Sequence, residues 1–164
     1  MSSDRLDLQK RELGPGDERI LAEATLINLN WNEPRFCEQD VRARQEFSHY
    51  TRLVPERGDF GIGAFDSARW AGVAWVLFLP QEDAGYGFVN DRIGELSVCV
   101  AETARGAGLG RELLNDVISI ARGRGHTAIS LSVEEGNPAR NLYESLGFAD
   151  VRGDAQPGTM LLTI

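Results

Sequence analysis

The 164-residue chain carries 17 Lys and Arg against 25 Asp and Glu, a formal net charge of -8. This charge disfavours nonspecific attraction to phosphate backbones and anionic lipid, so we expect no nucleic-acid or membrane partner, and it modestly favours a cationic ligand such as an amine. The length fits one domain spanning residues 1–164, because domains of roughly 100 to 150 residues are the commonest.

The cysteine and histidine content gives no support for a disulfide framework or a metal site. Cys37 and Cys99 are the only cysteines, and His49 and His126 lie far apart without metal-ligand spacing. The first ten residues are polar and lack the apolar core of a signal peptide, and no run approaches the ~18 apolar residues of a membrane span. We therefore expect a cytoplasmic protein without a bound metal.

The N-terminal segment predicts an edge strand and two helices. The strand is expected at Leu6 to Leu13, and a Gly-Pro-Gly turn ends it before Asp17, the expected N-cap of a helix that runs to about Leu29. The segment Trp31-Asn32-Glu33-Pro34 interrupts the helical pattern. Helical spacing then resumes from Glu38 to Val54, which predicts a second helix.

The middle of the chain predicts a hairpin followed by a loop and a further strand. Phe60 to Ala64 alternates with glycines, Asp66-Ser67 offers turn residues, and Val73 to Leu79 is a continuous apolar run, which together favour an antiparallel hairpin. The glycine- and asparagine-containing stretch Gln81 to Arg92 predicts a loop. Alternation of apolar and polar residues from Glu95 to Val100 indicates the next strand.

The C-terminal segment predicts two helices and three strands. A helix is expected from Gly108 to about Arg122, a strand from Ile129 to Val133, and a helix from its N-cap Asn137 to its C-cap Gly147. Short strands should follow at Phe148 to Arg152 and Thr159 to Ile164. The order βααβββαβαββ predicts a mixed α/β fold with a mostly antiparallel sheet of about seven strands, in which one strand-helix-strand unit implies a parallel pair.

A glycine-rich segment, Arg105-Gly106-Ala107-Gly108-Leu109-Gly110, lies where the chain turns from a predicted strand into a helix. Glycines let a ligand approach the backbone, and the free amides of the helix start attract phosphate oxygens, so a pyrophosphate would fit here. A dinucleotide fingerprint would need glycine at position 111, which is Arg111, and the Gly-Lys-Ser/Thr ending of a P-loop is absent. A tight turn without a ligand is the alternative.

Two motifs, in the same order and spacing, resemble the GNAT superfamily of acetyl-CoA-dependent N-acetyltransferases. The segment Arg105-Gly106-x-Gly108-x-Gly110 resembles its pyrophosphate loop, Gln/Arg-x-x-Gly-x-Gly/Ala, and Asn137 to Phe148 resembles its segment Asn-x-x-Ala-x-x-Leu-Tyr-x-x-x-Gly-Phe. The resemblance covers Glu95 to about Val151. It implies a GNAT-like fold with helices flanking the sheet and a splayed parallel pair of strands at the acetyl-CoA cleft.

The resemblance implies acetyl-CoA as the acyl donor and a set of residues that bind it. The pantetheine arm would run along the strand, where an amide near Val98 would polarise the thioester carbonyl, and the pyrophosphate would meet the glycine-rich segment. Asn137 would contact the cofactor as well as cap its helix. The expected cofactor-binding residues are Val98, Cys99, Val100, Arg105, Gly106, Ala107, Gly108, Leu109, Gly110, Arg111, Asn137 and Tyr143.

Two side chains are the candidates for catalysis. A lysine-like amine has a pKa near ~10.4, so some group must accept its proton. Glu95 is the candidate, because family members frequently carry at this strand start a carboxylate that acts through ordered water; an exposed strand-end charge is the alternative. Tyr143 matches the family's tyrosine that protonates the departing CoA thiolate, and a core aromatic is the alternative.

The acceptor is not identified by the sequence. In the family its specificity comes from the N-terminal helices and the loop matching residues 81–92, whose aromatic residues could line a pocket or belong to the core, so none is assigned: Trp31, Phe36, His49, Tyr50, Tyr86 and Phe88. Three functions stay open, in this order: direct acetylation of a primary amine on a small, cationic molecule, acetylation of a peptide or protein amine, and a noncatalytic acyl-CoA-binding module. A homodimer, common in the family, also stays open.

Overall fold

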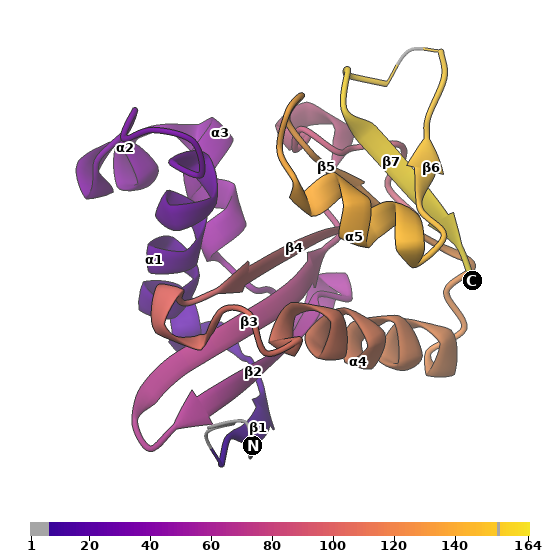
Figure 1. Cartoon of the computed structure of the whole chain (residues 1–164). Coiled ribbons are helices and arrows are strands. Elements are labelled where there is room, and N and C mark those ends of the chain that lie inside the picture. The colour runs from indigo at the N-terminus through magenta and orange to yellow at the C-terminus, as the bar shows by residue number, and fades with distance from the viewer. Residues whose placement is uncertain (1–6, 154) are drawn as a thin grey trace.

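The computed structural model describes residues 7–153 and 155–164, which form a mixed α/β fold around one sheet (Figure 1). The strand order is β1-β2-β3-β4-β5-β7-β6, and the one parallel pair in this sheet is β4 with β5. The predicted class and strand number are confirmed. The strands are β1 (Gln9–Glu12), β2 (Phe60–Asp66), β3 (Arg69–Leu77), β4 (Gly94–Val100), β5 (Ala128–Ser132), β6 (Ala149–Asp150) and β7 (Thr159–Thr163).

The two terminal strand predictions were too long. The first strand begins at Gln9, and Leu6 lies outside the described residues. The strand expected at Phe148 to Arg152 contains only Ala149–Asp150, because Phe148 is turned into the core and is 3% exposed. The predicted turn after it includes Asp154, which also lies outside the described residues.

The helices follow the predicted order, with one correction. They are α1 (Glu18–Leu29), α2 (Glu38–Ala43), α3 (Gln45–Ser48), α4 (Leu109–Gly123) and α5 (Ala139–Ser145). The prediction of one helix from Glu38 to Val54 was wrong, because Arg44 has an extended backbone (φ -95°, ψ 125°) that ends α2. Its guanidinium lies 5.3 Å from the Phe36 ring centroid and 5.6 Å from that of Phe47, a tertiary contact that helical spacing does not encode.

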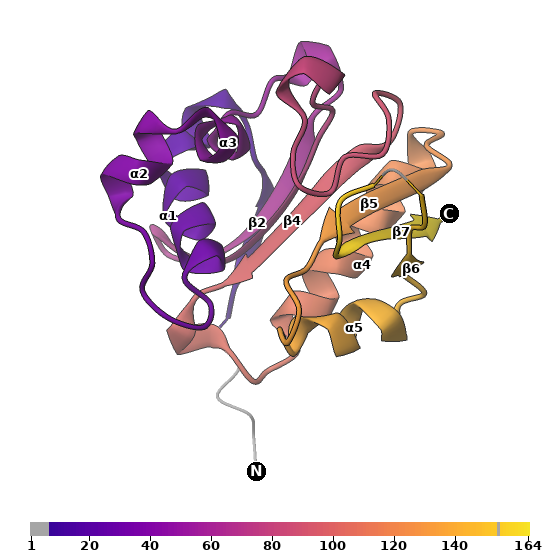
Figure 2. The same cartoon turned by 90° about the horizontal axis from the view of Figure 1, so that it is seen from above.

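The sheet is covered on both faces, which explains the continuous apolar run in β3. Val73, Trp75 and Leu77 pack in one cluster with residues of α1, whereas Ala74 and Val76 pack in another with α4. Alternate residues of a strand point to opposite faces, so a strand buried on both sides needs no polar positions. Figure 2 shows α1 on one side of the sheet and α4 with α5 on the other.

The parallel strands β4 and β5 separate soon after they meet. Their register contains only Gly94 with Ile129 and Glu95 with Ser130, after which β5 stays with β7 and β4 stays with β3. The edge of β4 that faces β5 is therefore left without a strand partner from Leu96 to Val100. Figure 2 shows the two strands diverging, and the predicted splayed pair is confirmed. Glu95 occupies the last paired position.

Among the described residues, no helix is long and apolar enough to cross a membrane.

Candidate active site

A cavity of about 760 Å³ opens where β4 and β5 diverge. It is lined from one side by α1 and the segment after it, and from the other by α5 and the segment before it. Eight predicted site residues line it: Glu95, Val98, Cys99, Val100, Arg105, Gly110, Asn137 and Tyr143. The other five, Gly106, Ala107, Gly108, Leu109 and Arg111, lie between Arg105 and Gly110 or directly after them in the chain.

The backbone of the glycine-rich turn requires glycine at two of its three glycine positions. Gly106 and Gly108 have φ angles of 86° and 82°, a region that L side chains rarely adopt, and a Cβ on either would meet nothing within 4 Å. The space around these residues is thus open to a ligand. A Cβ at Gly110 would make an ordinary contact 3.5 Å from Val100 Cγ2, so alanine fits there, as the Gly/Ala position of the resembled motif implies.

Side chains of the turn fasten it to the strands and helices around it. Leu109 is 5% exposed and packs in the α4 core cluster, so only its backbone is available to a ligand. The Arg105 Nε donates to the Val100 carbonyl oxygen at 3.1 Å, and Arg111 Nη2 donates to Ser145 Oγ at 2.9 Å. A fixed row of amides at the start of α4 is the arrangement that favours phosphate oxygens.

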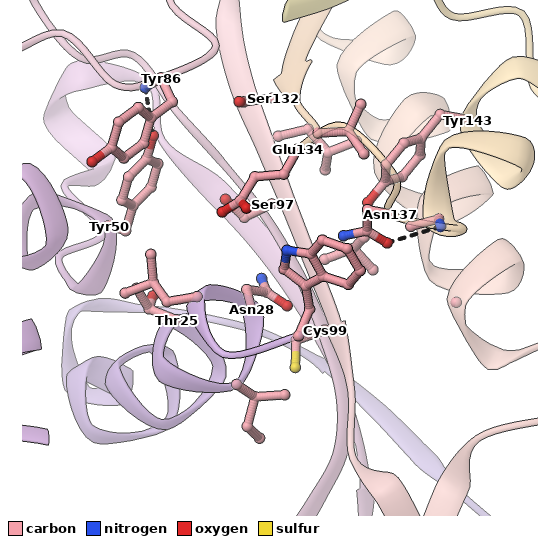
Figure 3. A pocket seen from close by; sticks show the side chains of 18 of the residues that line it. Thr25, Asn28, Tyr50, Tyr86, Ser97, Cys99, Ser132, Glu134, Asn137 and Tyr143 are labelled. Atoms are coloured by element: carbon pink, nitrogen blue, oxygen red, sulfur yellow. Dashed lines mark hydrogen bonds between the residues drawn. The ribbon is translucent and has the colours of Figure 1, made fainter. Parts of the chain in front are cut away.

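Asn137, just before α5, and Tyr143, within α5, lie on one side of the cavity (Figure 3). Asn137 Oδ1 accepts the Ala139 backbone N–H at 3.0 Å, but the N-cap of α5 is Pro138, one residue after the predicted Asn137. The Tyr143 ring packs edge-on against Phe148, with centroids 6.0 Å apart. Burial, with a smaller effect of Cys99, raises the pKa of Tyr143 to about 12, so the phenol carries its proton throughout the physiological range.

Glu95 is a buried carboxyl group, which contradicts the alternative of an exposed strand-end charge. The residue is 5% exposed, and its Oε2 accepts a hydrogen bond from Tyr50 Oη at 2.6 Å. Burial raises the pKa of Glu95 from an ordinary value of 4.5 to about 7, while Tyr50 and the Gly87 amide act to lower it. Although that amide lies close, Oε1 has no well-directed hydrogen-bond partner among the described residues. A pKa near the working pH suits a general base.

The loop after β3 closes directly over Glu95. A Cβ added at Gly85 would lie 2.1 Å from Glu95 Oε1 and 2.6 Å from Tyr50 Oη, and one at Gly87 would lie 2.6 Å from the Leu131 carbonyl carbon. Tyr86, between the two glycines, lines the cavity and is 39% exposed. Only residues without side chains at positions 85 and 87 let the backbone approach this closely.

At the end of the cavity that contains Glu95, the sequence offered six aromatic residues as candidates for a pocket or for the core, without assigning any. Of the six, the structure places Trp31, Phe36, Tyr50 and Tyr86 in the cavity lining, and Figure 3 shows Tyr50 and Tyr86 across the cavity from Tyr143. His49 instead contacts Asp83, its Nδ1 lying 2.9 Å from Asp83 Oδ1. Phe88 is likewise outside the lining.

Sequence reasoning missed an ion pair that joins the two walls of this end. Arg35 Nη2 donates to Glu134 Oε1 at 2.8 Å, linking the segment after α1 to the segment after β5, and both residues line the cavity. The Arg35 guanidinium holds the pKa of Glu134 below its usual range. The two residues are 99 positions apart, and no local pattern connects them.

Burial of Glu95 should make the protein less stable at high pH, and Glu95→Gln should relieve this. The folded state binds the Glu95 proton more tightly than the unfolded state, because the pKa is about 7 rather than 4.5. The stability contributed by the protonated acid is fully present below pH 4.5 and is lost as pH rises through about 7. The variant should therefore gain about 3 kcal/mol relative to the parent between these limits.

Denaturant unfolding of both proteins from pH 4 to 8.5 measures this difference. A stability difference that does not change with pH would mean that Glu95 is not a raised-pKa group in the folded protein.

The fold and the cavity indicate an acyltransferase domain, and a comparison with protein-family models supports this class. The sequence matches the model of the acetyltransferase (GNAT) family over residues 24–148, which is most of the chain. The chain therefore belongs to the GNAT family of acetyltransferases, as the two motifs indicated.

Individual relatives extend this similarity. A mycothiol acetyltransferase of Corynebacterium jeikeium (strain K411) is 33% identical over 133 residues, which cover 77% of this chain and 37% of that protein. The chain spans about a third of the length of the curated relatives it matches. An acetyltransferase of the GNAT family from Staphylococcus aureus Mu50 aligns with a TM-score of 0.70 and 14% identity, over 95% of this chain and 98% of that one.

A further solved structure, YncA from Salmonella typhimurium with its cofactor acetyl-CoA, aligns with a TM-score of 0.65. It is 24% identical to this chain, and the alignment covers 96% of this chain and 94% of that one. At these identities the solved structures support the shared fold.

Proposed function

We propose that the protein is an acetyl-CoA-dependent N-acetyltransferase that acetylates a primary amine of a small, cationic molecule by direct attack. The observation that carries this proposal is the pairing of a buried, raised-pKa carboxyl group, Glu95, with a protonated phenol, Tyr143, in the lining of one cavity. Amide formation from a thioester needs one group that accepts a proton from nitrogen and one that supplies a proton to sulfur.

Acetyl-CoA binding is supported by two features at the donor end. The edge of β4 at Val98 to Val100 has no strand partner on the side facing β5, so its backbone groups are available to an extended amide chain such as pantetheine. Gly106 and Gly108 leave open space beside the first amides of α4, which would hold the pyrophosphate. These features fit a long ligand that carries phosphate at one end and a thioester at the other.

The proposed reaction assigns one proton transfer to each of the two residues. The ammonium group of the acceptor first gives a proton to Glu95, directly or through a water molecule, and the neutral nitrogen then attacks the thioester carbonyl carbon. The second proton, which the nitrogen loses as the amide forms, passes to solvent. The carbon–sulfur bond then breaks with its electron pair going to sulfur, and Tyr143 donates a proton to the thiolate. The products are the acetylated amine and free CoA, and the two residues return to their starting states by exchange with solvent.

A small-molecule acceptor is favoured by the geometry of the cavity and by its relatives. The Arg35–Glu134 ion pair joins the two walls at the acceptor end, which restricts the space left for a long peptide. The curated relatives carry a name that refers to a small molecule, mycothiol. The carboxylate of Glu95, which also lines the cavity, suits an acceptor that arrives as a cation.

Release of free CoA thiol on mixing the protein with acetyl-CoA and a panel of amines tests the proposal. The panel should contain small mono- and diamines, amino sugars, aminoacyl amides and N-terminally free peptides. Thiol release with small cationic amines, matched by one acetylated product in the mass spectrum, is the expected result. Release with peptides alone would favour the peptide alternative, and no release above hydrolysis with any amine would favour a noncatalytic acyl-CoA-binding module.

A further inference from the structure

We propose that Tyr50 is a positioning residue, whose hydroxyl holds the Glu95 carboxylate in place through Oε2. The proposal rests on the role of Glu95 as the base in the proposed function. Tyr50 comes from the short turn His49–Thr51, 45 residues before Glu95, and nothing in the two motifs of the donor end refers to it.

The direction of the hydrogen bonds around Tyr50 follows from its partners. The Tyr86 backbone N–H can only donate, and it lies 2.8 Å from Tyr50 Oη, so it uses a lone pair of that oxygen. The single hydroxyl proton of Tyr50 is then directed to Glu95 Oε2, at 2.6 Å. A hydrogen bond donated to a carboxylate stabilises its ionised form, which is the form a base needs.

Tyr50 itself is held from its backbone side. It is 8% exposed, and its carbonyl oxygen accepts the indole N–H of Trp75 at 2.9 Å, with Trp75 fully buried in β3. The extended backbone at Arg44 ends α2, and the chain re-enters a helical turn that brings Tyr50 under the loop after β3. Because the ring is fixed at both ends, its hydroxyl cannot follow Glu95 if the carboxylate rotates.

The two carboxylate oxygens of Glu95 are therefore not equivalent. Oε2 is occupied by Tyr50, whereas Oε1 has no well-directed partner and lies where a Cβ at Gly85 would intrude. Glu95 also lines the cavity. The structure thus orients the carboxylate through Oε2, while Oε1 lies buried under the loop at Gly85.

The other titratable groups near Tyr50 and Glu95 influence the pKa of Tyr50 or contact one another. Among the described residues, Tyr50 is the titratable group that lowers the pKa of Glu95. The Gly87 amide also lowers this pKa, and burial raises it. Tyr86 acts on Tyr50. The His49 ring packs edge-on against the Tyr50 ring at 4.4 Å and faces Asp83 through Nδ1.

Removing the Tyr50 hydroxyl should therefore move the profile of kcat against pH along the pH axis, rather than lower kcat by the same factor at every pH. In Tyr50→Phe, burial of Glu95 is no longer opposed by this hydrogen bond, so the acid limb of the kcat profile should move to higher pH by about one unit. Turnover below the limb should fall about tenfold, and turnover well above it by less than about threefold. A merely structural role would lower turnover by a similar factor at every pH.

A titration of the free protein separates this proposal from the proposed function. The carboxyl carbon of Glu95 is followed by NMR in protein labelled with 13C-glutamate, and Glu95→Gln identifies its signal. The titration midpoint should rise by about one pH unit in Tyr50→Phe, whether or not Glu95 is the base. An unmoved midpoint would overturn the role of Tyr50 even if Glu95→Gln were inactive, whereas a moved midpoint with a fully active Glu95→Gln would reject only the base.

Two further variants keep the test decisive. Thr51→Val removes the neighbouring hydroxyl, which donates to the Ser48 carbonyl oxygen at 2.7 Å, and it should leave both the midpoint and the acid limb in place. Replacing Tyr50 with 3,5-difluorotyrosine keeps the ring and strengthens the donated hydrogen bond, so the midpoint should fall rather than rise. If Tyr50→Phe does not fold, this second variant decides the matter, and an unchanged midpoint in it would overturn the proposal.

Discussion

Glu95→Gln should lower turnover about 10²- to 10³-fold and leave acetyl-CoA affinity within about twofold, because general-base catalysis typically contributes 10²- to 10⁴-fold. The amide keeps the shape of the side chain and an oxygen for the Tyr50 hydroxyl, but it cannot accept a proton at neutral pH. The parent should gain activity as pH rises through about 7, where Glu95 ionises. The variant should lack this limb, and the ratio of the two activities should be largest between that pH and the pKa of the amine.

Glu134→Gln is a control that removes a carboxylate from the same cavity. Its side chain pairs with Arg35, so the change should affect the Michaelis constant for the acceptor and keep the acid limb of turnover in place. Steady-state rates of thiol release from pH 5.5 to 9.5 measure both variants. A Glu95→Gln protein with parental turnover and a parental pH profile would exclude Glu95 as the base.

Tyr143→Phe should lower turnover about 10²-fold with acetyl-CoA affinity nearly intact, because only the proton donor is lost. The ring would keep its edge-on contact with Phe148, so the loss should not come from misfolding of α5. The raised pKa of Tyr143, about 12, means that it stays protonated across the pH range of the assay. The loss should therefore be nearly independent of pH, unlike that of Glu95→Gln.

Tyr86→Phe provides the matched control, because it removes a phenol from the opposite end of the cavity. Tyr86 is 39% exposed and contacts Tyr50 through its backbone, which the substitution leaves in place. Its effect should fall on the Michaelis constant for the acceptor. Equal turnover of Tyr143→Phe and the parent would reject Tyr143 as the proton donor.

The backbone geometry of the glycine-rich turn and of the segment before α5 could be predicted from the sequence because it is local. Positive φ angles at Gly106 and Gly108, the side-chain hydrogen bond of Asn137 and the start of α4 each depend on residues within one turn. A short motif can therefore specify them. The position of Tyr143 could be predicted for the same reason, because helical spacing after Asn137 sets its place on α5.

The acceptor end could not be predicted because its contacts join distant parts of the chain. Glu95 was chosen from its position at a strand start, but its burial comes from the turn at Tyr50 and the loop at Gly85 to Gly87. Helical spacing misplaced Tyr50 in one long helix, since the break at Arg44 depends on rings it contacts in the folded protein. Aromatic residues at such spacing fit a core as well as a pocket.

Calorimetric titration of the purified protein with acetyl-CoA, with NADH and ATP as comparison ligands, tests the central claim most directly. Selective binding of acetyl-CoA is expected, and Gly108→Glu should abolish it, because a carboxylate would stand beside the amides that hold the pyrophosphate. Gly125→Glu adds the same charge just after the far end of α4, at a glycine whose φ angle of 84° imposes the same backbone strain and where a Cβ meets nothing within 4 Å, and it should keep binding. Failure to bind acetyl-CoA, or equal binding of NADH and ATP, would contradict the assignment of an acetyl-CoA site to this cavity.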